Sequence, residues 1–392
     1  MEADTLGRQT DETPVMNDIV GYRSFHADPN FNYQFNRWLP YLPEDELIEA
    51  ARRVNSLPTF QQVMFELAQK AEAENRTSKA AFYYRGAEFF THTSDPEKPI
   101  AYQKFQELFA ASTAGETYES DRIPFDDGFL PMISIPAKGE EIDTLVVHGG
   151  FDSFIEEFYW MMKEHAEAGY RVILFEGPGQ GGALHKYGLK MTHDWARVVG
   201  AVLDHMKVES CTLMGISLGG CLAMRAAAKE KRIERVVAND AMVSFYGCLA
   251  NRLGESKAKL LGFLLRNNLA AIVNRVMGKA VAADSTTAWA VAHGLNVTGT
   301  KTPFEYLKWA QAMTTGEISA KVTQDVLLLG AKDDHLVPLN QFFSQQASLT
   351  NARSVTARLF TAEEEASSHC HVGNQILVQK LIASWIMERL ES

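Results

Sequence analysis

Cysteine is scarce in this sequence, and basic residues are outnumbered by acidic ones. The 392 residues include four cysteines, with no C-x-x-C pair and no ladder of even spacings. Such scattered cysteines provide no disulfide framework, so we expect four reduced thiols. The formal net charge is -11, without the basic excess that nucleic acids and anionic membrane surfaces require. We therefore expect neither a nucleic acid nor a membrane as a partner.

Long hydrophobic runs are also missing. No stretch approaches the roughly 18 uninterrupted apolar residues of a membrane span. The N-terminal stretch M-E-A-D-T-L-G-R-Q-T-D-E-T is polar and acidic, whereas a signal peptide begins with basic residues followed by an apolar core. From these features we expect an intracellular, cytoplasmic protein.

The motifs that bind common cofactors are absent too. The glycine-rich run Glu176-Gly177-Pro178-Gly179-Gln180-Gly181 lacks a lysine and a hydroxyl residue at Walker spacing, and no G-x-G-x-x-G fingerprint with a downstream acid is present. We interpret this run as a tight strand-to-helix turn at the rim of an active site. No H-E-x-x-H motif or His/Cys/Asp cluster has metal-ligand spacing. The sequence therefore predicts neither an organic cofactor nor a metal.

What the sequence does contain is enough apolar residues, 46%, for a large core. Before residue 115, apolar residues recur at helical spacing, as at Phe60, Val63 and Met64. After a hairpin signal at Asp126-Asp127-Gly128, short apolar runs alternate with helical stretches. The predicted parts are a flexible tail (1–20), an N-terminal helical module (21–115), a first part of an α/β core (116–241), an inserted helical cap (242–323) and a second part of the core (324–392).

The apolar runs of the core are apolar on both faces and are separated by helical patterns. Strands of this kind belong to a largely parallel sheet covered by helices on both sides, which is an α/β fold. The expected strands are Thr144 to Val147, Arg171 to Phe175, Cys211 to Met214, Arg235 to Ala238 and Val326 to Leu329, with a last strand from about Val355 to Phe360.

The cap is rich in apolar residues, which would suit a lid or a pocket wall over the carboxyl edge of the sheet. For any one of these side chains, however, packing within the cap itself is the expected role, because apolar residues at helical spacing usually form a core. The residues concerned are Leu260, Leu261, Phe263, Leu264, Trp289 and Trp309.

Gly215-Ile216-Ser217-Leu218-Gly219 is the strongest local signal in the chain. It follows a predicted strand and precedes a helix that we expect from Cys221 to Lys229. In a nucleophile elbow, glycines flank the serine because the strand and the helix approach too closely for Cβ atoms. The turn exposes the hydroxyl at a helix N-terminus, where amide dipoles stabilise negative charge. Ser217 is therefore the predicted nucleophile.

A second glycine-rich turn, His148-Gly149-Gly150-Phe151, follows the first strand of the predicted parallel sheet. Glycines at this position let backbone N–H groups turn toward a bound carbonyl oxygen. Together with the amide of Leu218, the amides near Gly150 and Phe151 would form an oxyanion hole.

A serine nucleophile needs a base and an acid, which in this fold follow in the order acid, then histidine. We predict Asp334 as the acid from the D-x-x-V-P spacing after the fifth strand, and its neighbour Asp333 is the rival. His369, in a loop before the final helix, is the predicted base, and His371 is the alternative. His335 and His148 are expected to be structural or pocket residues.

Taken together, the motifs of this chain resemble those of the α/β-hydrolases related to 2,6-dihydropseudooxynicotine hydrolase and to the fungal heptaketide hydrolase of pigment biosynthesis. The N-terminal module contributes two further segments to the resemblance, which extends over about residues 30 to 390. The motifs are His148 to Asp152, Phe175 to Gly181, Gly215 to Gly220, Asp334 to Pro338, His369 to Asn374, Tyr84 to Phe90 and Asp95-Pro96.

The resemblance implies hydrolysis of a carbon–carbon bond beside a ketone, in a small hydrophobic substrate of β-dicarbonyl or polyketide-like type, by Ser217, Asp334 and His369 without a cofactor. It also implies a homodimer. Asp240 receives no role from it and is expected to be a structural turn residue. The residues leave open an esterase, a lactonase, an acyl transferase or a cyclase on the same triad, as well as a ligand-binding descendant without catalysis.

Overall fold

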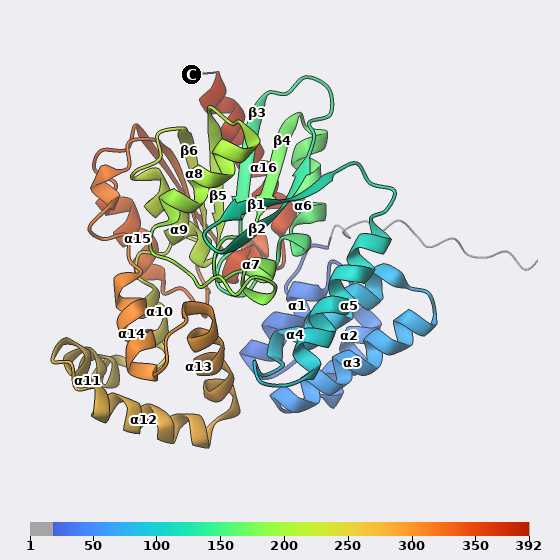
Figure 1. The fold of residues 1–392 in the computed structure, drawn as a ribbon, viewed down its shortest axis with the longest axis vertical. Coiled ribbons are helices and arrows are strands. Elements are labelled where there is room, and N and C mark those ends of the chain that lie inside the picture. Colours follow the sequence, from blue (N-terminus) through green and yellow to red (C-terminus); the bar gives the residue numbers. More distant parts are fainter. Residues whose placement is uncertain (1–18, 392) are drawn as a thin grey trace, which may run out of the picture. The chain divides into compact units, whose positions relative to one another are not determined.

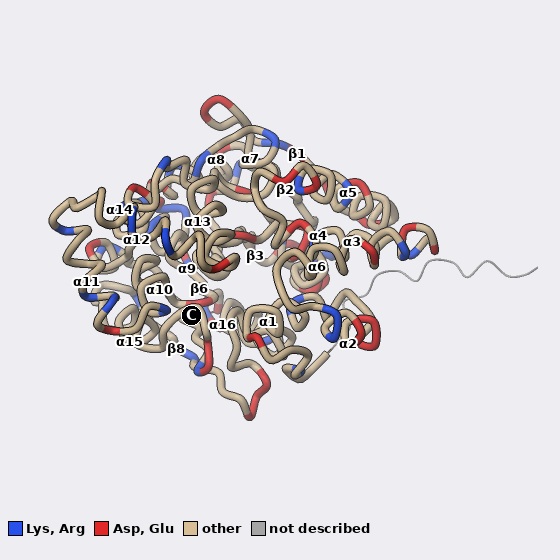
Figure 2. Tube along the Cα trace, turned by 90° about the horizontal axis from the view of Figure 1, so that it is seen from below, with Lys and Arg blue, Asp and Glu red and all other residues tan. Residues whose placement is uncertain are grey.

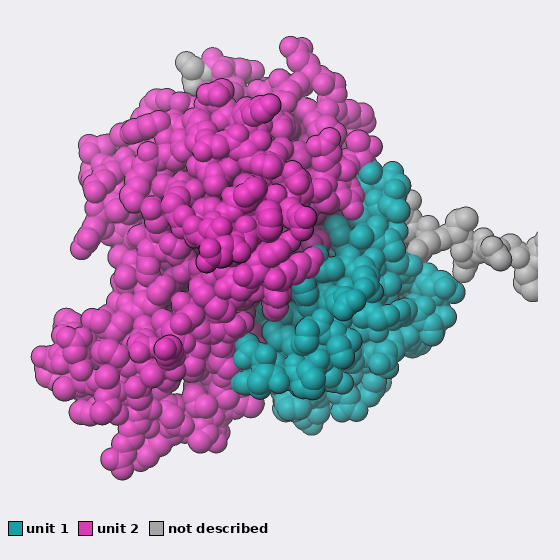
Figure 3. All heavy atoms as spheres, viewed as in Figure 1, with its two compact units in different colours: residues 1–18, 25–116 teal, residues 19–24, 117–392 magenta. Residues whose placement is uncertain are grey.

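The computed structural model describes residues 19–391, so most of the expected N-terminal tail lies outside the described residues. The chain divides into two compact units, which Figure 3 colours separately. One comprises residues 25–116, and the other comprises residues 19–24 together with the chain from Thr117 onward. Each unit is described by itself below.

The first unit is a bundle of helices around aromatic side chains. Three of its helices begin at a side-chain cap or turn: Asp28 caps the first helix, Ser56 and Thr59 form a capping box, and Asp95 accepts a hydrogen bond from the Glu97 amide. The D-P segment singled out in the sequence thus starts a helix. The helices are α1 (Pro29–Trp38), α2 (Glu44–Arg53), α3 (Leu57–Ala73), α4 (Thr77–Phe90) and α5 (Glu97–Ser112).

The second unit is built on an eight-stranded sheet in the order β1-β2-β4-β3-β5-β6-β7-β8. An antiparallel hairpin forms one edge, with its turn at Asp126 and Asp127, and the strands from β3 onward are parallel to one another. The strands are β1 (Glu119–Phe125), β2 (Gly128–Ile135), β3 (Asp143–His148), β4 (Tyr170–Phe175), β5 (Cys211–Ile216), β6 (Ile233–Asn239), β7 (Asp325–Ala331) and β8 (Ser354–Phe360).

Helices cover both faces of this sheet (Figure 1). On one face α6 and α16 lie together, joined by a hydrogen bond of 3.0 Å between His165 and Gln379, and on the other face α8 packs on α9. The strands between them are almost wholly buried, as their apolar runs predict. These helices are α6 (Tyr159–Glu167), α7 (Gly181–His185), α8 (Trp195–Met206), α9 (Leu218–Ala227), α15 (Leu339–Ser348) and α16 (Gln375–Leu390).

Five helices are inserted between β6 and β7, where the sequence predicts a cap. Leu265, Val273 and Leu307 form a small buried cluster of their own, and Leu261 and Leu264 pack against it. Of the other apolar residues expected there to pack, Leu260 and Phe263 are more than half exposed. The cap helices are α10 (Phe245–Asn251), α11 (Glu255–Arg266), α12 (Ala270–Ala283), α13 (Ser285–Thr298) and α14 (Pro303–Ala312).

Charged residues of both signs are interspersed along the described chain (Figure 2). Within residues 19–391, no helix is long and apolar enough to cross a membrane.

Candidate active site

Ser217 stands at the junction of β5 and α9, with a φ of 61° and a ψ of -126°. A side chain on Gly215 would place its Cβ 1.9 Å from the carbonyl oxygen of Gly219, so only glycine fits there. The helix begins at Leu218, three residues earlier than the sequence predicts, because the elbow leads directly into it. Ser217 therefore lies at the N-terminus of α9, where the helix dipole favours negative charge.

The side chains of Ser217, His369 and Asp334 form a continuous hydrogen-bonded row. Ser217 Oγ lies 2.8 Å from Nε2 of His369, and Nδ1 of His369 lies 2.7 Å from Oδ2 of Asp334. A proton on Nδ1, donated to the carboxylate, leaves Nε2 as the acceptor for the serine hydroxyl. The structure thus brings together the three residues that the sequence predicts as nucleophile, base and acid.

The carboxyl group of Asp334 is oriented by its own loop. Its Oδ1 accepts hydrogen bonds from the amides of Leu336 and Val337, at 2.7 and 2.9 Å, which leaves Oδ2 to face the imidazole. The D-x-x-V-P spacing reflects this turn. Asp333, the rival acid, is exposed, and its amide donates to the carbonyl of Ser367.

Asp240, expected to be a turn residue, contacts the same imidazole nitrogen as Asp334. It follows β6, the neighbour of β7, and its Oδ2 lies 2.8 Å from Nδ1 of His369. The expectation was wrong because contact depends on the sheet order, which brings the carboxyl ends of adjacent parallel strands to one edge. Burial opposes the charge of both carboxyls. At Asp240 the interactions with His369 and His371 outweigh this effect of burial and hold the pKa of the carboxyl at about 2. At Asp334 burial prevails, and the pKa is raised.

The loop that carries His369 has an unusual backbone. Cys370 and His371 have φ values of 51° and 57°, in the left-handed region that residues other than glycine rarely adopt. Such residues each cost about 1–3 kcal/mol and persist only where their surroundings hold them. His371, the alternative base, is fully buried; its Nδ1 lies 3.1 Å from the Ala366 carbonyl and its Nε2 lies 3.4 Å from Oδ1 of Asp240.

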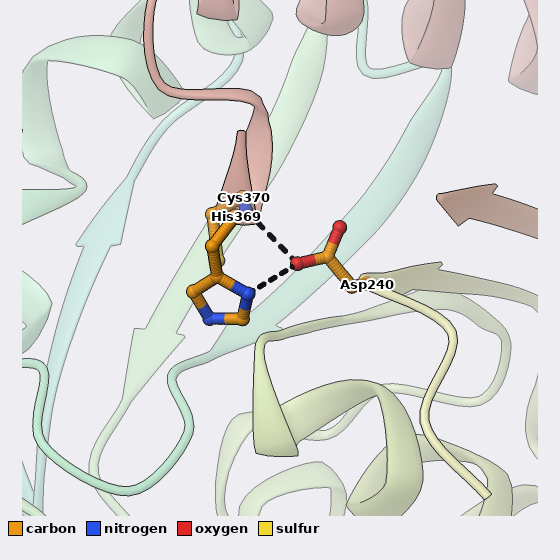
Figure 4. A group of neighbouring side chains, drawn as sticks. All are labelled: Asp240, His369 and Cys370. Atoms are coloured by element: carbon orange, nitrogen blue, oxygen red, sulfur yellow. Dashed lines mark hydrogen bonds and ion pairs between the residues drawn. The ribbon is translucent and has the colours of Figure 1, made fainter. Parts of the chain in front are cut away.

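Asp240, His369 and Cys370 also have potential metal-ligand atoms within 4.8 Å of one another. Their chemistry favours hydrogen bonding instead. Metals bind the thiolate form of cysteine, and burial raises the pKa of the Cys370 thiol to about 11. In addition, Oδ2 of Asp240 already accepts a hydrogen bond of 2.9 Å from the Cys370 amide (Figure 4). We therefore describe this group as a hydrogen-bonded cluster around the imidazole.

The predicted oxyanion loop lies directly against the elbow. A Cβ on Gly150 would lie 2.8 Å from the Leu218 amide nitrogen, so the backbones meet at this point. The Leu218 amide is in the first turn of α9, where N–H groups have no acceptor within the helix. The Gly150 amide donates to Ser153 Oγ at 3.3 Å, a long contact. Gly150 and Leu218 are thus adjacent, as an oxyanion hole requires.

Gln180, interpreted from the sequence only as part of a turn, holds this loop in place. Its Nε2 donates to the carbonyls of Gly149 and Gly150, at 2.7 and 2.8 Å, and its Oε1 accepts from the Gly177 amide. The side chain is buried. Sequence reasoning missed this contact because the glycines of the run dominated the pattern.

A buried carboxyl group, Glu176, lies in the same turn. It accepts hydrogen bonds from the amides of Gly182 and, at 3.4 Å, Ile155. Burial, followed by the neighbouring carboxylate of Glu156, raises its pKa to about 8. At neutral pH Glu176 is therefore largely protonated.

Two histidines near the site, the buried His148 and the half-buried His335, have pKa values below the ordinary 6.5. Burial lowers the pKa of His148 to about 4; its Nε2 accepts a hydrogen bond of 3.2 Å from Trp195, which places the ring proton on Nδ1, 3.0 Å from the Gly149 carbonyl. Burial and the charge of His369 lower the pKa of His335 to about 3. The expectation of a structural role for His148 agrees with these contacts.

Aromatic residues of the cap pack around Phe151. Its ring lies 4.9 Å from that of Phe245 and 5.1 Å from that of His293, and His293 Nε2 lies 3.1 Å from the Phe151 carbonyl. Tyr306 stacks on the same ring at 6.5 Å. Helices α10, α13 and α14 of the cap therefore contact the loop beside the nucleophile.

The elbow, the row of side chains behind it and the sheet order are those of a large enzyme family, whose model, described as "Alpha/beta hydrolase family", matches residues 144–375. The chain belongs to the α/β-hydrolase family. The expected fold class and the expected hydrolase class are thereby confirmed.

Similar proteins extend the match beyond the core. Hydrolase LUC6 of Fusarium sp is 29% identical over 77% of this chain and 82% of its own length. The 20-hydroxy-prefusarin hydrolase FUS2 of Gibberella moniliformis is 29% identical over 78% and 83%. The crystal structure of the 2,6-dihydroxy-pseudo-oxynicotine hydrolase shares the fold, with a TM-score of 0.62 over 90% of this chain and 94% of that chain at 17% identity. The resemblance inferred from the motifs is confirmed.

Proposed function

We propose that this α/β-hydrolase uses Ser217, His369 and Asp334 to cleave a carbon–carbon bond beside a ketone in a polyketide-like substrate. The observation that carries the proposal is the 2.8 Å contact between Ser217 Oγ and His369 Nε2 at a strained elbow. A serine hydroxyl becomes a nucleophile when a base takes its proton in this way.

In the proposed reaction, His369 takes the hydroxyl proton as Ser217 Oγ bonds to a ketone carbon. The amides of Leu218 and of the Gly150–Phe151 turn stabilise the oxyanion that results. In a β-dicarbonyl substrate the adjacent carbon carries a second carbonyl group. Collapse of the oxyanion breaks the bond to this carbon, the electron pair of that bond leaves as an enolate, and the imidazolium protonates the enolate. Water, deprotonated by His369, then attacks the acyl-serine and releases a carboxylic acid and free Ser217.

Two observations support an apolar, polyketide-like substrate. Aromatic residues of the cap surround Phe151 beside the nucleophile. FUS2, a relative similar over most of its length, is named as a hydrolase of 20-hydroxy-prefusarin. An ester or lactone would react through the same acyl-serine, with an alcohol leaving in place of the enolate. The leaving group is therefore the part of the proposal that needs a direct test.

The first test is intact-mass spectrometry after incubation with a fluorophosphonate. We expect one adduct on the wild type and on Ser344→Ala, an exposed serine of α15 that serves as the matched control, and none on Ser217→Ala. Turnover by Ser217→Ala should fall by roughly a million-fold, as for other serine nucleophiles. Absence of an adduct on folded wild-type protein would overturn the assignment of Ser217 as the nucleophile.

The second test compares an aryl 1,3-diketone with the ester of the same carbon skeleton. Mass spectrometry of the products should find the acid together with the ketone released from the diketone. Turnover of the ester alone would show that the activity is that of an esterase and not carbon–carbon cleavage.

The homodimer and the cytoplasmic location inferred above stay predictions. Light scattering would test the homodimer.

A further inference from the structure

The cluster behind His369 contains one more carboxylate than a serine triad needs. Asp240 and Asp334 each have an Oδ2 within 2.8 Å of Nδ1 of His369. The side chains of all three residues are at most 5% exposed. Because a buried carboxylate requires partners, the position of Asp240 is unlike that of an ordinary turn residue.

Asp240 holds the loop of the base at three successive residues. Its Oδ2 contacts the His369 ring and accepts a hydrogen bond from the Cys370 amide (Figure 4). Its Oδ1 lies 3.4 Å from Nε2 of His371. Cys370 and His371 are the two residues with left-handed backbone. Asp334, in contrast, contacts this loop through the His369 ring and is fixed by amides of its own loop.

From this arrangement we infer that Asp240 is a second acid of the site, a positioning residue that holds the His369 loop and shares the Nδ1 proton with Asp334. The inference rests on the proposed function of His369 as the base. In the ground state, one N–H faces two carboxyl groups. When His369 takes the serine proton, both groups lie beside the positive charge that forms on the ring, so each stabilises it.

Because two carboxyl groups contact the same imidazole nitrogen, each can partly replace the other. Loss of the only acid of a serine triad lowers kcat by about ten-thousand-fold, because the ring loses its tautomer and orientation. Here we expect Asp334→Asn and Asp240→Asn each to lower kcat by only about ten- to a hundred-fold, with little change in KM. The double variant should reach the full loss, roughly ten-thousand-fold.

The matched control is Asp333→Asn, which removes the same charge from an exposed position next to Asp334 and should leave kcat unchanged. Asp240→Glu keeps the charge with a longer side chain and should restore part of the rate lost in Asp240→Asn. A full ten-thousand-fold loss of kcat in Asp334→Asn, with less than a three-fold loss in Asp240→Asn, would overturn the inference that Asp240 is a second acid.

A measurement without substrate separates this inference from the proposed function. In protein labelled with nitrogen-15 in histidine, the titration midpoint of His369 can be followed by nuclear magnetic resonance and assigned by its loss in His369→Gln. Removing either negative charge should lower the midpoint by about one pH unit or more, whereas Asp333→Asn should barely change it. A role confined to packing would leave the midpoint of Asp240→Asn unchanged and overturn the inference.

The two failures are distinguishable. Suppose that the wild type forms no fluorophosphonate adduct but the titration midpoint of His369 moves in both aspartate variants. The assignment of Ser217 as the nucleophile is then wrong, whereas the inference that the two aspartates share the Nδ1 proton is supported. If the adduct forms and the midpoint moves only in Asp334→Asn, the hydrolase stands and Asp240 is not a second acid.

Discussion

Helices α4 and α12 have the same length, 14 residues, and opposite relations to solvent. Every residue of α4 from Ala80 to Phe90 is buried, whereas in α12, which the structure describes throughout, Val273 alone is buried. α4 therefore derives its stability from packing on all sides, and α12 from one half-buried face that contacts α11, α13 and α14. The N-terminal unit has a core of its own, whereas the cap combines a small cluster with residues, such as Phe245 and Tyr306, that belong to the main core of the second unit.

Even the charges of α4 are part of its core. Glu88 lies between Arg85 and Lys98, with its carboxylate oxygens 2.5 and 2.6 Å from the two cationic nitrogens, and all three side chains are at most 7% exposed. Buried ions of this kind persist because each is paired. The Tyr84 to Phe90 motif thus describes a helix that packs an ion cluster among aromatic rings.

The largest effect should follow from breaking this cluster. We expect Glu88→Ala to lower the free energy of unfolding by about 3–5 kcal/mol, because it removes a buried carboxylate that forms ion pairs with two buried cations. Urea unfolding followed by circular dichroism measures the loss. The matched control is Glu107→Ala, an exposed glutamate on α5. A loss as small as that of the control would mean that the cluster contributes little.

A smaller effect should come from the core of the cap. Leu265 is fully buried in the cluster with Val273 and Leu307. Leu265→Ala should destabilise the protein by about 2 kcal/mol, at the lower end for such changes, because a small cluster can relax around the cavity. Faster proteolysis within residues 242–323, with the N-terminal unit intact, would be the signature. Cleavage that is no faster within residues 242–323 than in the N-terminal unit would contradict a loss of stability confined to the cap.

The smallest effect should come from the exposed face of α12. Val276 is 57% exposed, so Val276→Ser should change the free energy of unfolding by no more than about 0.5 kcal/mol. The same urea titration measures it. A loss above 1 kcal/mol would show that this face is covered in solution, and the contrast between the two helices would then be weaker than described.

Local pattern was sufficient to predict most of the secondary structure. The strand at Cys211, the elbow at Ser217 and the helix around Phe60 each follow from residues within a short window, because periodicity and glycine spacing act locally. The start of α9 was placed three residues late, since a strained serine leads straight into the helix.

The misses at the site are contacts between distant segments. Asp240 and Asp334 meet at one imidazole because β6 and β7 are neighbours, and Gln180 reaches the Gly149 carbonyl across the ends of β3 and β4. Neither contact leaves a local pattern. A sequence argument that followed the strand ends of the predicted parallel sheet could have brought Asp240 to the base.

The protonated Glu176 has a practical consequence. Its folded pKa, about 8, lies above its ordinary value of 4.5, so between these pH values folding takes up a proton. The free energy of unfolding should therefore fall as pH rises from about 4.5 toward 8, and level off above it. Alkaline buffers, often chosen for ester assays, would ionise a group that holds the Ile155 amide next to the oxyanion loop. A neutral or slightly acidic buffer keeps that support uncharged.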